Sequence, residues 1–346
     1  MPTRTGSSPI PSPTIAKLAP GAPGRLRRAS SWGMVILALA TTFICFGSSP
    51  AGTKAALSSF SPLLIMTVRG GVAGAVLTTW ALWSGARPPN LRQLVSAFLV
   101  GTLILALGAG VGTMGQRTVA SGVVGVLSAM MPLIAACLGF LLFREKPAKR
   151  ALVGLVIGFV GIGLLLRPGS DLDLFGVTLV VAAQVAWALG AVLAPRLRLP
   201  EDPRLAAGLE LLSGSGVLLM ADVALHEFSG LHLDAVSRSS GLGLGWLVLT
   251  AVGGFTAYGF LAKRVSTSIS TTFAYVNPVV AVGLGSLLFG EPLSMRMMAA
   301  TVVVVLGVFL IVSASSPEPQ RRVHHPMTSG HGHVARIARD ESAPRT

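Results

Sequence analysis

The carboxylate of Glu210 lies deep inside an apolar run. Glu210 falls within residues 205–225, and no Lys or Arg stands within one helical turn of it. An ionised side chain at the centre of a membrane-spanning helix costs about 2.5–3.5 kcal/mol on insertion scales, so it requires a reason. We expect Glu210 to take up and release a proton or to hold a substrate amine. The alternative is a structural ion pair with an arginine of another helix.

Two basic residues, Arg69 and Lys54, also stand in or beside apolar runs, so their charges need an explanation as well. Arg69 stands inside the apolar run 62–83, where its guanidinium could bind a substrate carboxylate through two hydrogen bonds. It could instead cap helix carbonyls, pair with Glu210, or extend to the membrane surface. Lys54 follows the string GSSPAG, in which Pro50 and Gly52 are expected to interrupt the first helix. An interrupted helix can expose backbone groups to a transport site, but a simple interfacial anchor is the favoured interpretation of Lys54.

Polar groups also surround a proline in the run 269–289. Pro278 lacks a backbone donor and therefore leaves the carbonyl of Ala274 free. Tyr275 and Asn277 add hydrogen-bonding side chains beside that turn. Such a kink could form part of a central binding site, although a packing kink satisfied by neighbouring helices explains it equally well.

Three further side chains suit the wall of a cavity for an organic solute. They are Gln184, Trp187 and Tyr258. Aromatic faces bind apolar and cationic groups, although Trp and Tyr also populate membrane interfaces. Trp187 is too central in its run for an interfacial position.

Part of the sequence that carries these residues is an internal repeat. Shifted by 146 positions, the stretch 121–150 aligns with 267–296, so that Pro132 meets Pro278 and Glu145 meets Glu291. A long internal repeat of apolar segments is typical of secondary transporters. The matched glutamates predict a role in the fold, such as fixing the following turn with Arg150 or Arg296.

Composition predicts a membrane protein. Hydrophobic residues make up 52% and charged residues 12%, with a mean hydropathy of +0.72. The apolar runs are long enough to cross a hydrocarbon layer of about 30 Å. We therefore expect an all-α polytopic membrane protein with ten transmembrane helices. The expected spans are 32–50, 62–83, 94–113, 119–143, 152–166, 175–194, 205–225, 242–262, 269–289 and 297–313.

Charge distribution predicts the topology. Basic residues concentrate in alternate loops, among them the loop 144–150, which predicts that both termini are cytoplasmic. Each half has five spans, so the second half must run in the opposite sense, as two inverted five-helix repeats. The expected boundaries are a disordered basic tail at 1–31, repeats at 32–167 and 175–313, and a second disordered tail at 315–346.

The sequence does not contain the residue patterns expected of a nucleic-acid-binding protein, an enzyme or a metalloprotein. The net charge of +14 follows from span-flanking loops and tails, so no nucleic-acid partner is expected. No metalloprotease, nucleotide-binding or nucleophile-elbow motif occurs, so we expect neither an enzyme nor a cofactor. The tail segment HHPMTSGHGH has a metal-binding composition but no Cys or carboxylate partners, and no metal site is expected. Cys45 and Cys137 lie in apolar runs as buried thiols.

Three strings show a resemblance to a known family. Residues 46–69 (FGSSPAGTKAALSSFSPLLIMTVR), 206–220 (AAGLELLSGSGVLLM) and 273–294 (FAYVNPVVAVGLGSLLFGEPLS) resemble the EamA family of the drug/metabolite transporter (DMT) superfamily, and within it the YedA-type inner-membrane transporters. The resemblance covers residues 32–313. It departs at Phe46, where the family usually has Trp, and at Gln116, in a stretch where relatives vary.

The resemblance implies movement of small metabolites, often amino-acid-like or drug-like, across the cytoplasmic membrane and mostly outward. The absence of a nucleotide motif predicts energy from a gradient or from exchange, by alternating access. The expected partners are a small-molecule substrate and the lipid bilayer, with protons as the candidate coupling ion and a homodimer as a candidate assembly. The alternatives are an uncoupled facilitator or exchanger, and a non-transporting membrane scaffold component.

Overall fold

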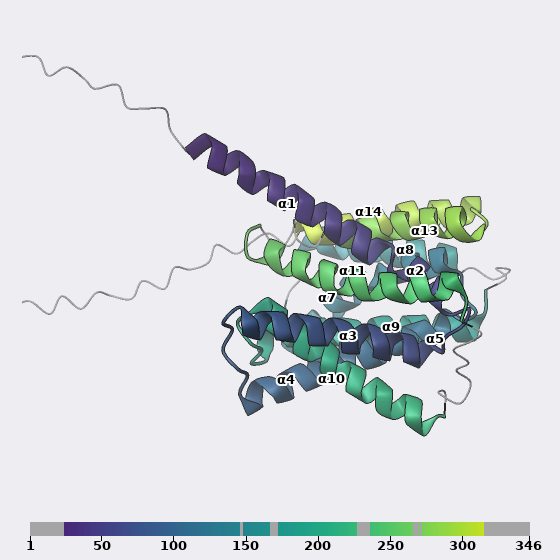
Figure 1. The fold of residues 1–346 in the computed structure, drawn as a ribbon. Helices are drawn as coiled ribbons and strands as arrows, with labels where there is room; N and C mark the ends of the chain where they lie inside the picture. Colours follow the sequence, from purple (N-terminus) through teal and green to yellow (C-terminus); the bar gives the residue numbers. More distant parts are fainter. Residues whose placement is uncertain are drawn as a thin grey trace, which may run out of the picture. The chain divides into compact units, whose positions relative to one another are not determined.

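A computed structural model describes residues 24–145, 148–166, 172–226, 236–265, 269 and 272–314. Every regular element in the described part is helical, and these helices belong to one compact unit within Met1–Ser315 (Figure 1). The elements are α1 (Gly24–Gly47), α2 (Ser49–Ala56), α3 (Pro62–Trp83), α4 (Leu91–Gly101), the π-helix η1 (Thr102–Gly110), α5 (Val111–Gly115), α6 (Ser121–Ser128), α7 (Met130–Phe143), α8 (Lys149–Leu165), α9 (Leu174–Leu193), the 3-10 turn η2 (Ala194–Arg196), α10 (Pro203–Ala224), α11 (Arg238–Ala262), α13 (Phe273–Phe289) and α14 (Met295–Ala314).

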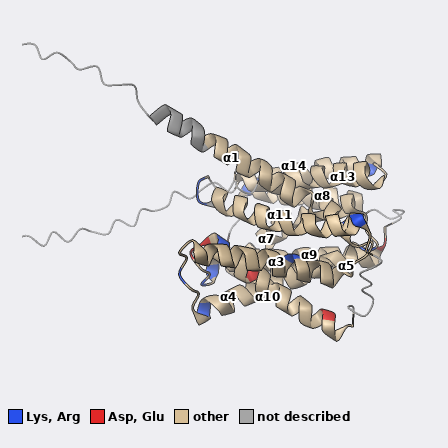
Figure 2. Ribbon diagram, viewed as in Figure 1, with Lys and Arg blue, Asp and Glu red and all other residues tan. Residues whose placement is uncertain are grey.

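Eight of the described helical segments are long and apolar enough to cross a membrane, and α13 is a shorter apolar helix. Several of these segments combine consecutive elements, as in Leu91–Gly115, which contains α4, η1 and α5. The helix α8 occupies the place of the fifth expected span. Figure 2 shows charged residues mainly at helix ends, so that few charges lie in the middle of the helices. The expected all-α polytopic membrane fold is therefore confirmed.

Local signals in the sequence explain where several helices begin. The Ser61 side chain accepts a hydrogen bond from the Leu64 backbone N–H at 3.3 Å, and Pro62 supplies the first helical residue of α3. Asn90 and Gln93 form a reciprocal capping box at the start of α4. Asp202 caps α10 in the same way as Ser61 caps α3, by accepting from the backbone N–H of Arg204 at 2.8 Å.

Asp202, the residue that caps α10, also forms an ion pair with Arg204. The Arg204 guanidinium donates to the Asp202 carboxylate with an Nη2–Oδ2 distance of 2.8 Å. This hydrogen bond is the main reason that the pKa of Asp202 falls to about 2. The cap is therefore anionic at every physiological pH and complements the positive end of the helix dipole.

The first expected span was placed too short. It was expected to stop at Pro50, but the helical segment continues to Ala56 and bends only at Ser48, between α1 and α2. The backbone hydrogen bonds from Ser48 N to Ile44 O and from Gly52 N to Ser48 O, both 3.0 Å, keep the turns connected. Pro50 is tolerated because it lies in the first turn of α2, where no earlier carbonyl needs its N–H.

Helices from the two halves of the sequence pack in matched pairs. The second expected span packs against the seventh (α3 with α10), the fourth against the ninth (α6 with α13), and the fifth against the tenth (α8 with α14). The packing of α1 and α2 on α11 is mirrored by that of α9 on η1 and α5. These are the contacts expected when two similar halves are related by an internal two-fold axis.

Small residues allow the close approach of the paired helices. A Cβ atom at Gly74 of α3 would lie 2.9 Å from the Gly208 carbonyl of α10, and one at Gly307 of α14 would lie 2.7 Å from the Gly154 carbonyl of α8. Lipid provides no hydrophobic force between helices, so tight packing at small residues supplies the association.

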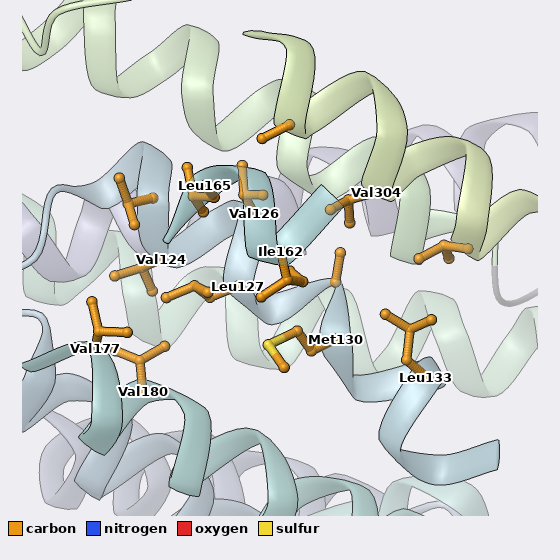
Figure 3. Close-up of a cluster of buried hydrophobic side chains, with 14 of the residues drawn as sticks. Val124, Val126, Leu127, Met130, Leu133, Ile162, Leu165, Val177, Val180 and Val304 are labelled. Atoms are coloured by element: carbon orange, nitrogen blue, oxygen red, sulfur yellow. The ribbon is translucent and has the colours of Figure 1, made fainter. Parts of the chain in front are cut away.

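Apolar side chains fill the space between these pairs. One core contains residues of α6, α7, α8, α9 and α14, and Figure 3 shows Leu127, Ile162 and Val304 among its members. A second core joins residues of α2, α3, η1, α10 and α11, including Ile65 and Leu247, which are completely buried. The two cores fix the helices that carry the candidate site.

Candidate functional site

Glu210 lies on α10 beside the point where α4 becomes η1. Its backbone carbonyl lies so close to Gly101 that a Cβ atom there would collide with it. The side chain is half-buried, and no described residue forms a hydrogen bond or an ion pair with its carboxylate. The alternative of a structural pair with an arginine is therefore not realised among the described residues.

Arg69 lies on α3, the helix that packs against α10. It is only 7% exposed, which is not the position of a side chain that extends to the membrane surface. Its Nη1 lies 3.7 Å from the Met66 Sδ, a weak acceptor, and its Nε has no hydrogen-bond partner among the described residues. A guanidinium carries five N–H donors, so Arg69 retains the capacity to bind an anion.

The π-helix η1 separates α4 from α5 in the third span. Trp187 of α9 packs against it: a Cβ atom at Gly108 would lie 3.2 Å from the Trp187 Cε3. Gln184, one turn earlier on α9, is 8% exposed. The Thr102 hydroxyl at the start of η1 is buried with no hydrogen-bond partner among the described residues. Segments of π-helix are frequent at functional sites.

Four aromatic rings from three helices form the aromatic cluster, defined as Phe46, Phe255, Tyr258 and Phe273. The ring centroids of Phe46 and Phe273 are 5.1 Å apart, those of Phe46 and Phe255 5.9 Å, and those of Tyr258 and Phe273 5.7 Å. All three pairs meet edge to face, an arrangement that aromatic quadrupoles favour. The cluster joins α1, α11 and α13.

The structure separates the polar residues of α13. Asn277 is one helical turn from Phe273, and its buried Oδ1 has no hydrogen-bond partner among the described residues. Tyr275 instead packs edge to face on Phe309 of α14, at 6.1 Å, and Phe309 is 50% exposed. Tyr275 thus lies on another face of α13 than the aromatic cluster. Pro278 is buried inside a helix that continues past it.

Lys54 stands within a helical turn rather than after a break, because α2 extends to Ala56. It is half-buried and forms no ion pair with a described residue. Two side chains hold the bend next to it: Gln116, the C-cap residue of α5, and Trp246 of α11. Gln116 donates from Nε2 to the Pro50 carbonyl at 2.6 Å, and Trp246 donates from Nε1 to the Ser48 Oγ at 2.9 Å.

The backbone turn that leads into each of the two repeat-related glutamates, Glu145 and Glu291, has the same geometry. Glu145 N donates to Gly139 O at 3.3 Å, and Glu291 N donates to Gly285 O at 3.2 Å. Each follows a residue in the left-handed conformation that ends its helix, α7 or α13. Pro132 lies near the start of α7, as Pro278 lies inside α13.

The side chains of these glutamates have different partners. Glu291 accepts from Ser121 N at 2.7 Å, from Ser121 Oγ at 2.9 Å and from Gly122 N at 2.9 Å, all at the first turn of α6. Glu145 pairs with Arg196, whose guanidinium also lies over the Phe143 ring at 3.7 Å. Neither carboxylate uses the Arg150 or Arg296 proposed from the sequence.

Several residues of this region were missed from the sequence. Phe255 and Phe273 resemble the ordinary apolar residues around them, and only their pairing in space marks them. Gln116 is 3% exposed, and Asp222 is fully buried. No group of three potential metal ligands occurs among the described residues, and the histidine-containing tail lies outside them.

Comparison with known proteins identifies similar chains. The model of the EamA-like transporter family matches residues 32–167 and again 174–313. The inner membrane transporter YedA of Escherichia coli K12, whose function is uncharacterised, is 35% identical over 84% of this chain and 94% of its own. The uncharacterised transporter YvbV of Bacillus subtilis is 26% identical over 82% of this chain and 92% of its own. A solved crystal structure shares the fold with a TM-score of 0.57, at 16% identity over 82% of this chain and 99% of that chain.

Proposed function

Because this chain belongs to the EamA-like transporter family, we propose that it is a secondary-active exporter of small organic metabolites that works by alternating access. Its membrane-length helices make it a multi-pass membrane protein. A similar chain described as an inner membrane transporter supports placement in the cytoplasmic membrane. The basic loops of the sequence support cytoplasmic termini.

The observation that carries the proposal is a pair of ionisable groups on packed helices. Arg69 on α3 and Glu210 on α10 both lie inside membrane-length helices, and neither has an ion-pair partner among the described residues. Intramembrane ionisable residues mark substrate and proton pathways. In our proposal Arg69 binds a substrate carboxylate, and Glu210 carries a proton or a substrate amine. A solute with both groups is amino-acid-like.

The rest of the site would accommodate the organic part of the solute. Tyr258 contributes to the aromatic cluster, and Asn277 offers a free acceptor beside it. Trp187, Gln184, Lys54 and Tyr275 complete the proposed set of cavity-lining or coupling residues. Tyr275 has the weakest support, because its ring packs toward α14. Alternation would be a movement of one inverted repeat against the other, which the matched helix pairs support.

The test is solute flux in proteoliposomes. Purified protein is reconstituted and offered a panel of amino acids and drug-like cations, with and without an imposed pH gradient. We expect accumulation of particular solutes only with the gradient. Equal flux under both conditions would support the alternative of an uncoupled facilitator or exchanger. An absence of flux for the whole panel would contradict the proposal for these solute classes.

A second candidate is a scaffold that organises a partner protein without transporting. Long tails beyond the described helices favour it, since such segments are common interaction sites. Removal of residues 1–23 and 315–346 separates the candidates. A transporter should retain its flux in liposomes without these residues, whereas a scaffold should lose its activity in cells.

A further inference from the structure

The contact between Glu291 and the first turn of α6 joins the two halves of the chain. Glu291 follows α13, in the second half, and its carboxylate accepts three hydrogen bonds from Ser121 and Gly122, in the first half. Each carboxylate oxygen accepts from a different residue, Oε1 from Ser121 and Oε2 from Gly122. Charge-assisted bonds at a helix N-terminus are among the stronger polar contacts in proteins.

The contact is also closely packed. A Cβ atom at Gly122 would lie 3.3 Å from the Val282 Cα and 3.4 Å from the Glu291 Oε2, and one at Gly125 would collide with Ala281. The absent side chains let α6 and α13 touch along this whole turn. A carboxylate held in this way closes one end of the α6–α13 pair.

The repeat-related Glu145 has a different partner among the residues that the structure describes. Glu145 ends α7 in the same backbone geometry, yet its side chain is 60% exposed and pairs with Arg196 at the end of η2. The positions that match Ser121 and Gly122, Thr267 and Ser268, lie outside the described residues. Among the described residues, therefore, Glu291 is held by groups at a helix N-terminus and Glu145 by a guanidinium.

We propose that the contact of the Glu291 carboxylate with Ser121 and Gly122 is a latch that closes this face of the transporter and breaks when the face opens. This inference rests on the proposed alternating-access function. It adds which contact closes a face. An inverted repeat moves between states by exchanging the arrangements of its two halves. Among the described residues, Glu291 and Glu145 have different partners, as such an exchange would predict.

The test uses two repeat-related cysteine reporters, Val282→Cys and Ala136→Cys, each in a background with Cys45→Ser and Cys137→Ser. Both reporter positions are half-buried, and they stand 146 residues apart, as the two glutamates do. The protein is placed in lipid nanodiscs, where both faces are open to a membrane-impermeant maleimide. The rate of labelling then reports the opening of each face without knowledge of the substrate.

We expect Glu291→Gln to raise the labelling rate at Val282→Cys by about tenfold and to lower it at Ala136→Cys at least about twofold. The matched control, Glu145→Gln, should not raise labelling at Val282→Cys. Glu291→Asp should have an intermediate effect on the labelling rates, and Ser121→Ala a small effect. These two variants allow the test to be made even if Glu291→Gln folds poorly. Local loosening alone would raise the rate at Val282→Cys without lowering it at Ala136→Cys, and that result would overturn the latch.

Solute flux is measured separately on the same variants. If solute flux is observed but Glu291→Gln does not change the labelling rates, the latch is rejected and the proposed transport function is retained. Labelling that follows the series while no solute moves would support the latch and count against the proposed transport function.

Discussion

The Ser215 hydroxyl of α10 donates a hydrogen bond of 2.7 Å to the Thr67 carbonyl of α3. This bond fixes the helix that carries Glu210 against the helix that carries Arg69, two residues from the arginine and five from the glutamate in their sequences. In an apolar surrounding, a hydroxyl that bonds across helices ties their registers together. In the described conformation this bond therefore holds the two proposed ionisable groups in register along the helix pair.

Glu210→Gln should abolish gradient-driven flux and leave any exchange of substrate in place, because glutamine cannot release a proton. The measurement is uptake into proteoliposomes with and without a pH gradient. Glu201→Gln is the matched control, since Glu201 is exposed in the loop before α10. Gradient-driven flux that survived Glu210→Gln unchanged would remove Glu210 from proton coupling.

Phe273→Ala should weaken binding of an aromatic or apolar solute, with KM raised by about tenfold, because edge-to-face contacts and buried ring area are lost. Phe309→Ala, on α14, should change KM by less than about twofold, because that ring is 50% exposed and lies outside the aromatic cluster. The measurement is the concentration dependence of initial flux. Equal effects of the two substitutions would contradict the assignment of the aromatic cluster to substrate.

Gly208→Ala should destabilise the paired helices α3 and α10. A Cβ atom there would lie 2.8 Å from the Thr78 backbone nitrogen, which cannot move without its helix. Overpacking costs about 1–3 kcal/mol, so we expect Tm in detergent to fall by roughly 2–10 °C. Gly216→Ala, on the same helix with nothing within 4 Å, should leave Tm unchanged. A stable Gly208→Ala variant would show that the helices are less tightly packed.

Asp202→Ala should lower thermal stability above about pH 4 and have less effect near pH 2. The pKa of Asp202 is lowered to about 2 in the folded protein, mainly by the Arg204 hydrogen bond. A lowered pKa contributes stability that is present above the ordinary value of about 3.9 and is lost as the pH falls through about 2. Thermal unfolding of both proteins from pH 5 to pH 2 measures the difference. A difference in Tm that did not change with pH would contradict a stabilising role of the ionised carboxylate.

Membrane spans could be predicted from the sequence because their signals are local. Ser61 and Pro62 mark the start of α3, and the span expected at 62–83 coincides with Pro62–Trp83. Pro50 misled the prediction, because a proline in the first turn of a following helix bends a span without ending it. Whether a proline stops or bends a helix depends on the carbonyl partners of its neighbours, which sequence alone does not reveal.

The ionisable candidates could be found for a similar reason, since Arg69 and Glu210 stand out against apolar runs. Their surroundings could not be predicted. The aromatic cluster depends on α1, α11 and α13 meeting in space, and Glu291 reaches a partner that is 170 positions away along the chain. The repeat correctly paired Glu145 with Glu291 by position, yet it could not show that their side chains have different partners.

The left-handed residues that end α7 and α13 show that one turn shape is built from two kinds of residue. Gly290 adopts φ 63° without strain, but at the matching position Arg144 adopts φ 54°, where an L-residue with a side chain costs about 1–2 kcal/mol. The two halves thus share the shape of the turn and differ in the residue that forms it. At Arg144 the surrounding structure stabilises a backbone conformation that the residue itself disfavours, and the following glutamate starts from the same geometry in both halves.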